Sequence, residues 1–166
     1  KKSFRLLFKG GYGDTKLRYR LFGDDAAEEF DQIVLRAGAN DGYAWGGYED
    51  RVQYTRDQFL RDLQRATGNA SPHGFFVHLY INGLYWGLYH VIERPNAAFF
   101  AEHLGGEPEE YDVLQHKGGT VDGNRDAWNA MMAIADGGMA SAGAYRAIQE
   151  YLDVPNLIDY LLVHFY

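Results

Sequence analysis

Hydrophobic and polar residues alternate along several short stretches of the N-terminal half, a pattern typical of β-strands. Phe4, Leu6 and Phe8 share one face of the first stretch, and residues 17–22 and 32–36 repeat the alternation beyond a glycine-rich loop. We expect the second stretch to pair with the first as its antiparallel partner, and the third to form another short strand.

The clearest local pattern is a β-hairpin around Asn82-Gly83. This dipeptide, which favours a type I′ turn, joins two runs of aromatic and β-branched residues at 75–81 and 84–93. Pairing Ile81 with Leu84 fixes the register, and strict alternation then divides the side chains between two faces. The face predicted to be core carries Phe75, Val77, Leu79, Ile81, Leu84, Trp86, Leu88 and Ile92. The other, mixed face carries Phe76, His78, Tyr80, Tyr85, Gly87, Tyr89, Val91 and Glu93.

The C-terminal half changes to helical periodicity, after one earlier helix that begins near Thr55. A short helix is expected after Pro95, and three more over residues 126–135, 141–152 and from Pro155 onward. The side chains of the first of these three that should face inward are Trp128, Met131 and Met132.

These elements, with a short strand at 111–114, predict an α+β fold with an antiparallel sheet on the N-terminal side and helices on the C-terminal side. The first strand starts at residue 1, and the last helix has a start signal but no stop signal. Residues 1–166 are therefore expected to form part of one domain that is truncated at both ends.

Composition narrows the classes of function. The 166 residues are 46% hydrophobic and 16% aromatic, which excludes a disordered chain, and no apolar run reaches membrane-spanning length. The formal charge of -7 disfavours binding to nucleic acid or insertion at an anionic membrane. The absence of cysteine excludes disulfides and thiolate metal sites, and no histidine pair has the spacing of a helical zinc site.

A long loop follows the third strand and combines glycine with polar and aromatic residues. Asn40 and Asp41 are ordinary turn formers, and Tyr43, Trp45 and Tyr48 are spaced by glycines. Loops of this kind are often used for binding, so a carbohydrate-binding module is one alternative to consider.

Several short motifs follow one another along the chain. They are Lys2-Ser3-Phe4-Arg5, Arg36-Ala37-Gly38-Ala39-Asn40-Asp41, Tyr54-Thr55-Arg56-Asp57, Tyr80 to Tyr89, Ile92-Glu93-Arg94, Tyr111-Asp112-Val113-Leu114, and Asp122-Gly123 followed by Trp128. In order and spacing these motifs resemble the CotH kinase family of bacterial spore-coat proteins. The resemblance covers nearly the whole chain, and its most specific part is the Asn-Gly-x-Tyr-x-Gly-x-Tyr hairpin with a trailing glutamate.

The resemblance implies an atypical, kinase-like protein that uses ATP and Mg or Mn to phosphorylate serine on protein substrates. It places the metal-binding and catalytic aspartates beyond Tyr166, so the catalytic residues of this chain are unknown and the fragment alone is expected to be inactive. It also suggests the spore coat, or secretion to the cell surface, as the place of action. The alternative is a non-catalytic, kinase-like surface or coat module that binds proteins or glycans.

Five residues are the candidates for binding the nucleotide. Lys1, Lys2 and Arg5 supply cations for phosphate, with Lys2 first and Lys1 as its alternative, and Arg56 opens a helix whose N-terminus attracts anions. Glu93 matches the family's acidic position, and we expect it to form an ion pair with Lys2.

Each of these assignments has a simpler structural alternative. The basic residues are also what an ordinary solvated surface would carry. Glu93 would equally stabilise the start of the helix after Pro95 through the helix dipole. The histidines are expected to be structural, because strict alternation places His78 and His90 on opposite faces of the hairpin, and no metal site is predicted.

Overall fold

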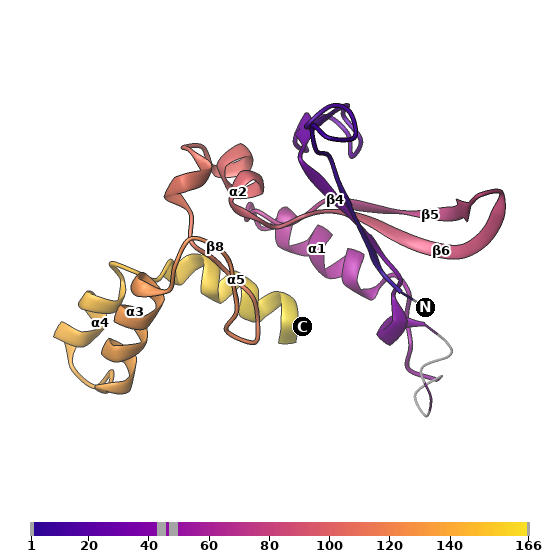
Figure 1. Ribbon diagram of the computed structural model, residues 1–166. Coiled ribbons are helices and arrows are strands. Elements are labelled where there is room, and N and C mark those ends of the chain that lie inside the picture. Colours follow the sequence, from indigo (N-terminus) through magenta and orange to yellow (C-terminus); the bar gives the residue numbers. More distant parts are fainter. Residues whose placement is uncertain (1, 43–45, 47–49, 166) are drawn as a thin grey trace. The chain divides into compact units, whose positions relative to one another are not determined.

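The computed structural model describes residues 2–42, 46 and 50–165. They form two compact units, of which unit 1 comprises residues 1–66 and 70–95, and unit 2 comprises residues 67–69 and 96–166 (Figure 1). Both helices and antiparallel sheets are present, so the predicted α+β class is confirmed.

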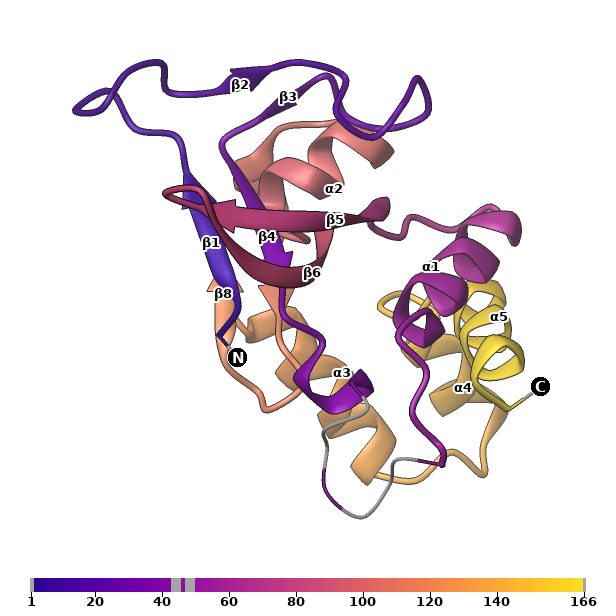
Figure 2. The same ribbon diagram turned by 90° about the vertical axis from the view of Figure 1, so that its right-hand side faces the viewer.

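Unit 1 is built on a four-stranded antiparallel sheet (Figure 2). The strand order is β1 (Phe4–Leu7), β4 (Gln32–Arg36), β6 (Leu84–Glu93) and β5 (Gly74–Ile81). The predicted pairing of residues 17–22 with the first strand is wrong. Within that stretch β2 (Leu17–Arg18) pairs with β3 (Glu29–Phe30), while β1 pairs with β4. The pattern predicted the strands but could not choose between two antiparallel partners of similar composition.

The predicted hairpin is confirmed at its turn. Asn82 (φ 50°) and Gly83 (φ 80°) both have the left-handed backbone that a type I′ turn requires, and Ile81 lies opposite Leu84. The register then shifts, because Tyr80 pairs with Tyr85 whereas its neighbour Leu79 pairs with Gly87.

The extra residue of this β-bulge is Trp86, and beyond it the two faces of β6 are exchanged relative to strict alternation. The prediction that Tyr89, Val91 and Glu93 share a face with Phe76 is therefore wrong. Gly87 (φ 133°) provides the backbone freedom at the bulge.

Because of this shift, β6 contributes Tyr89 and Val91 to the core together with the odd-numbered residues of β5. Tyr89 is only 1% exposed, so it is a core residue and not a surface aromatic. His78 and His90, expected on opposite faces, share one face of the sheet. The buried core residues are Ala27, Phe30, Ile33, Leu35, Ala37, Tyr89 and Val91.

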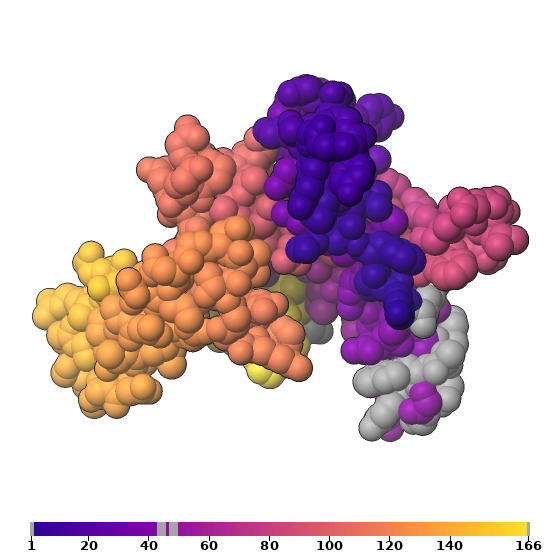
Figure 3. All heavy atoms as spheres, viewed as in Figure 1, coloured from indigo at the N-terminus to yellow at the C-terminus, as the bar shows by residue number. Residues whose placement is uncertain are grey.

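The end of the hairpin carries large apolar side chains that remain exposed. Tyr80, Leu84, Tyr85 and Trp86 are each at least half exposed. Figure 3 shows this end of the hairpin projecting from the rest of unit 1. The predicted core positions of Leu84 and Trp86 are therefore wrong, because the strands extend beyond the part of the sheet that β1 and β4 complete.

The second face of the sheet interacts with side chains of α1 (Arg56–Ala66), the helix predicted from Thr55. Gln58 on α1 is hydrogen-bonded to His90 on β6, and Phe76 on β5 stacks on the His90 ring with the centroids 4.6 Å apart. Between β4 and α1 lies the 3-10 turn η1 (Ala39–Asp41).

Unit 2 contains all the helices predicted for the C-terminal half. Its elements are α2 (Ala97–Leu104), η2 (Pro108–Glu110), β7 (Val113–Leu114), β8 (Thr120–Asp122), α3 (Asp126–Asp136), α4 (Ala142–Ile148) and α5 (Val154–Phe165). Sequence analysis missed β8, which pairs with β7. The inward positions predicted for Trp128 and Met132 are wrong, since these side chains are 44% and 37% exposed.

Within the described ranges, every helix is too short or too polar to cross a lipid bilayer.

The close packing of α1 on the sheet makes Gly74 a sensitive position. A Cβ atom there would lie 2.6 Å from both Gln58 Oε1 and His90 Nε2, so we expect Gly74→Ala to destabilise unit 1 by about 1–3 kcal/mol through overpacking. Gly11→Ala is the matched control, because no atom lies within 4 Å of its added Cβ. Urea denaturation of the intact protein measures the difference, and equal stabilities of the two variants would contradict the packing.

Candidate functional site

Glu93, at the end of β6, is the most buried acidic or basic residue that the structure describes in unit 1. The residue is 1% exposed, and a carboxylate this far from water needs hydrogen-bond donors to remain ionised. The backbone N–H of Ala27 donates to Oε1 at 3.4 Å, and the backbone N–H of His73 donates to Oε2 at 2.7 Å. Two segments far apart in the sequence thus hold this side chain.

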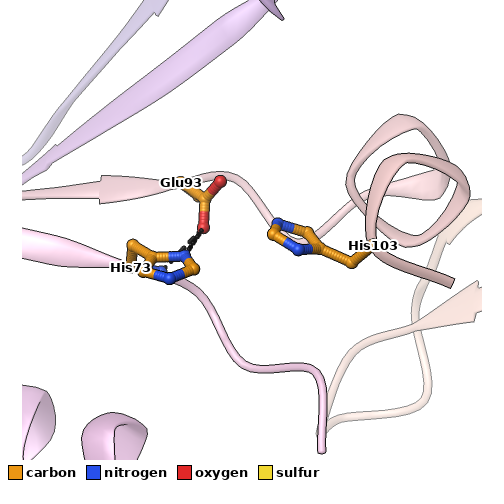
Figure 4. A group of neighbouring side chains, drawn as sticks. All are labelled: His73, Glu93 and His103. Atoms are coloured by element: carbon orange, nitrogen blue, oxygen red, sulfur yellow. Dashed lines mark hydrogen bonds and ion pairs between the residues drawn. The ribbon is translucent and has the colours of Figure 1, made fainter. Parts of the chain in front are cut away.

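The His73 side chain adds a further contact to the same carboxylate (Figure 4). Its Nδ1 lies 2.8 Å from Glu93 Oε2, and the imidazole is also largely buried. The two residues are cross-strand neighbours, because Gly74 pairs with Ile92 and the Glu93 N–H donates to the His73 carbonyl at 3.1 Å. Without the bulge, strict alternation would have placed Pro72 opposite Glu93.

The His73–Glu93 pair resembles the carboxylate–histidine arrangement that fixes imidazole orientation in many sites. A carboxylate oxygen can only accept, so a hydrogen bond to Glu93 places a proton on His73 Nδ1. The two groups are also ligand types that divalent cations accept. In the observed geometry the carboxylate serves first to orient the ring, which makes the pair a rigid polar element at the end of the sheet.

Lys2 is fixed through its backbone at the other end of the same face. Its carbonyl accepts a 2.8 Å hydrogen bond from the Tyr89 hydroxyl, while Ser3 Oγ accepts from the Ala37 N–H at 3.0 Å. Glu93 lies four residues beyond Tyr89 along β6, roughly 13 Å at the rise of an extended strand. The Lys2–Glu93 ion pair therefore remains a prediction, and it requires the lysine side chain to reach along the sheet.

The other predicted phosphate ligands do not gather on one face. Arg5 pairs with Val34, and alternation places it on the face opposite Phe4 and Lys2. Arg56 opens α1, where its Nη2 donates to the Arg51 carbonyl at 2.6 Å and so anchors the preceding loop. Lys1 lies outside the described residues, as do Tyr43, Trp45 and Tyr48 of the aromatic loop.

A second polar cluster joins α1 to the sheet around Asp57. Its Oδ2 accepts from Arg61 Nε at 2.9 Å and lies 3.2 Å from Arg36 Nη1, which also lies 3.1 Å from Asp41 Oδ2. Burial alone would raise the pKa of the Asp57 carboxyl. The Arg61 hydrogen bond and the charges of Arg61 and Arg36 outweigh this effect and lower the pKa below its ordinary value.

His90 completes the cluster as a neutral imidazole. Burial lowers its pKa, and although Asp57 acts in the opposite direction, the charges of Arg61 and Arg36 add to the lowering. Gln58 Nε2 donates to Asp62 Oδ1, so Gln58 Oε1 faces His90 Nε2 at 2.6 Å and selects the tautomer protonated at Nε2. The cluster thus orients α1 on the sheet, and its positive charges are those of Arg36 and Arg61, not of the His90 ring.

Two further residues of the site were missed by sequence analysis. His73 had no local signal, because its role depends on the bulge that places it opposite Glu93. Arg94 follows Glu93 directly, and its Nε is buried with no hydrogen-bond partner among the residues that the structure describes. A buried guanidinium nitrogen with an unused N–H is suited to an anionic ligand.

The helix-dipole alternative for Glu93 is weakened by the capping of α2. The Asn96 side chain accepts from the Phe99 N–H at 3.1 Å, and Asp122 Oδ2 accepts from the Ala97 N–H at 2.9 Å. Both groups of unit 2 satisfy first-turn amides that Glu93 would otherwise have been expected to stabilise.

A small antiparallel sheet with a buried strand-end glutamate, followed by a helical unit, is consistent with a kinase-like α+β protein. In a comparison with protein families, the chain matches the CotH kinase protein family over residues 1–166. The chain therefore belongs to the CotH kinase family. No curated protein and no solved structure matches it.

The lowered pKa of His90 predicts acid destabilisation of unit 1. The unfolded chain binds the proton near pH 6.5 and the folded state does so only at lower pH, so stability falls as the pH drops from about 6.5 through the folded-state pKa. The expected slope is at most about 1.4 kcal/mol per pH unit for one proton. The pKa of Asp57 is lowered too, so this group loses its contribution only at more acidic pH.

Urea denaturation at pH 7 and pH 5 measures this effect in the intact protein. We expect His90→Gln, which keeps a side-chain donor for Gln58, to reduce the stability difference between the two pH values. His116→Gln, at an exposed position, should leave the difference unchanged. The same reduction in both variants would show that burial of His90 is not the cause.

Proposed function

We propose that the protein containing this chain is an ATP-dependent protein serine kinase that requires Mg or Mn. Membership of the CotH kinase family over residues 1–166 is the observation that carries the proposal. Residues 1–166 are proposed to form part of the kinase domain, and the aspartates that hold the metal and catalyse transfer to lie beyond Tyr166.

In this proposal Lys2 contacts the phosphates. Its ammonium group has no ion-pair partner within the described ranges, while its backbone is fixed by Tyr89. Transfer of the γ-phosphoryl group depends mainly on positioning and charge neutralisation, so a positioned, unpaired cation is suited to this role. Arg5 and Arg56 are proposed as further cations that act from other parts of unit 1.

Glu93 is proposed as the carboxylate that orients the phosphate-binding groups. Its charge is held in place by His73 and Ala27, so it does not have to reorganise when the nucleotide binds. Arg94, with its unused buried Nε, would add a donor for an anion beside Glu93. Bound ATP supplies the γ-phosphoryl group, and the divalent cation neutralises charge on its oxygens.

A specific feature favours a second candidate function, a kinase-like surface or coat module that binds other proteins. The hairpin end displays Tyr80, Tyr85 and Trp86, which are 61%, 55% and 50% exposed. Aromatic residues of this kind are enriched in protein interfaces. Such a module would not consume ATP, so a phosphoryl-transfer assay separates the two functions.

The test uses the full-length protein with radiolabelled ATP, Mg or Mn, and a serine-containing protein acceptor. We expect incorporation of label into serine, and a loss of ATP affinity of about tenfold in Lys2→Met because one charge-assisted phosphate contact is removed. Lys9→Met is the matched control, since it removes an exposed lysine near the other end of β1, and it should leave affinity unchanged.

Glu93→Gln tests the carboxylate separately from the fold. Turnover should fall while a urea denaturation curve shows that the protein remains folded, because glutamine matches glutamate in size and keeps one oxygen, for either the Ala27 or the His73 donor. Unchanged ATP affinity and turnover in this variant would leave Glu93 only a structural role. If the unsubstituted full-length protein neither binds ATP with either metal nor labels serine, the kinase proposal is wrong.

A further inference from the structure

Unit 2 contains a cavity of about 350 Å³ that the proposed nucleotide contacts do not use. It is formed by β7, the first two turns of α3 and the segment between α4 and α5. Its lining residues are Asp112, Leu114, Asn124, Ala127, Trp128, Met131, Tyr151 and Leu152. This size lies at the lower end of ordinary ligand pockets, so it suits one side chain more than a large ligand.

The carboxylate of the exposed Asp112 is the charged group of this cavity, and only one of its two oxygens accepts hydrogen bonds from the residues that the structure describes. Its Oδ1 accepts from the Asn124 backbone N–H at 2.6 Å and from Asn124 Nδ2 at 3.1 Å. The other oxygen, Oδ2, has no donor among the residues that the structure describes. The Asn124 amide is itself fully engaged, because its Oδ1 accepts from the Asp126 N–H at 2.7 Å. Asp112 is thus held rigidly with one oxygen available.

Two aromatic residues of the lining also remain partly exposed. Trp128 and Tyr151 are 44% and 48% exposed, and in the described part of the chain neither the indole N–H nor the phenol hydroxyl has a hydrogen-bond partner. Leu114, Met131 and Leu152 supply the aliphatic wall. An aromatic face beside a carboxylate and an aliphatic wall is the combination that receives a cation on an apolar stem.

The charged residues around the cavity are mainly acidic, which is complementary to a cationic side chain. No lysine or arginine lines it, and the nearby Arg125 donates to the Gly118 carbonyl. Glu150 and Asp153 flank the lining residues Tyr151 and Leu152 in the sequence, and Asp126 begins α3. This acidic setting opposes a phosphate, and the mainly aromatic and aliphatic lining offers a divalent cation few oxygen ligands besides Asp112.

We propose that this cavity binds an arginine or lysine side chain of the protein substrate. The proposal rests on the proposed kinase function and adds a specificity determinant, a basic residue in the acceptor protein. The cation pairs with Asp112 Oδ2 and lies against Trp128, while its methylene stem packs on Leu114, Met131 and Leu152. Acceptors without a basic residue would then bind more weakly although their serine is unchanged.

The test measures binding without turnover. The intact protein is labelled with 5-fluorotryptophan, the Trp128 signal is assigned with Trp128→Phe, and fluorine NMR follows titration with the amides of Gly-Arg-Gly, Gly-Lys-Gly and Gly-Gln-Gly at constant ionic strength. We expect saturable shifts of the Trp128 signal with the two basic peptides and none with the neutral one. Comparison of the two basic peptides shows which cation the cavity prefers.

Asp112→Asn is the decisive variant, because asparagine keeps Oδ1 for the Asn124 donors and replaces the charged Oδ2 by a neutral NH2 group. Affinity for the basic peptides should fall about three- to tenfold. Asp136→Asn, which makes the same charge change at the far end of α3, should leave affinity unchanged. Equal effects of both variants, or equal shifts with the neutral peptide, would overturn the proposal.

A kinase assay then separates this inference from the proposed function. With a basic protein acceptor, Asp112→Asn should raise KM and leave kcat close to that of the unsubstituted protein. Loss of peptide binding with normal ATP use refutes only the specificity site. Peptide binding that depends on Asp112, in a protein that transfers no phosphate, supports the cavity and refutes the kinase proposal.

Discussion

The burial of one carboxylate constrains the whole of unit 1. Glu93 is removed from water at the end of β6, and an ionised group in that position is stable only when donors are already in place. The donors come from Ala27 and His73, so the loop before β3 and the segment before β5 must both meet the end of β6. The two outer parts of unit 1 are thereby fixed against the central strands.

Local sequence signals predicted the elements of this arrangement but not its register. Asn82-Gly83 specifies the turn and its first pair, yet the extra residue at Trp86 changes which side chains face the core. Gly87 was the available signal, because glycine inside a strand often marks a bulge. The family motif identified Glu93, whereas its partner His73 becomes visible only when the bulge is counted. Long-range pairings such as β1 with β4 also have no local signature.

The sheet separates its charged groups by face. On one face Glu93 accepts hydrogen bonds from backbone N–H groups and contacts one imidazole, while on the other Asp57 is paired with Arg36 and Arg61. Since Arg36 and Arg61 serve the internal cluster, they are poor candidates for a ligand. The better candidates for contacting phosphate are basic residues that are not already paired with a carboxylate. For this reason we favour Lys2 and Arg94 over the other basic residues of unit 1.

The two units also differ in the sign of the ligand charge that they suit. Unit 1 offers the cations Lys2 and Arg94 and a carboxylate that is already hydrogen-bonded, whereas unit 2 offers a carboxylate with one oxygen unpaired by the described residues, beside exposed aromatic rings. A kinase must hold an anionic nucleotide and a protein acceptor without exchanging their places. In the proposed kinase, opposite charge preferences in the two units would exclude each ligand from the other's site, because a phosphate is repelled by Asp112 and a basic side chain by Lys2. This discrimination between ligands depends on the positions of a few charged side chains, such as Lys2 and Asp112. It does not depend on the net charge of -7 or on contact between the sites.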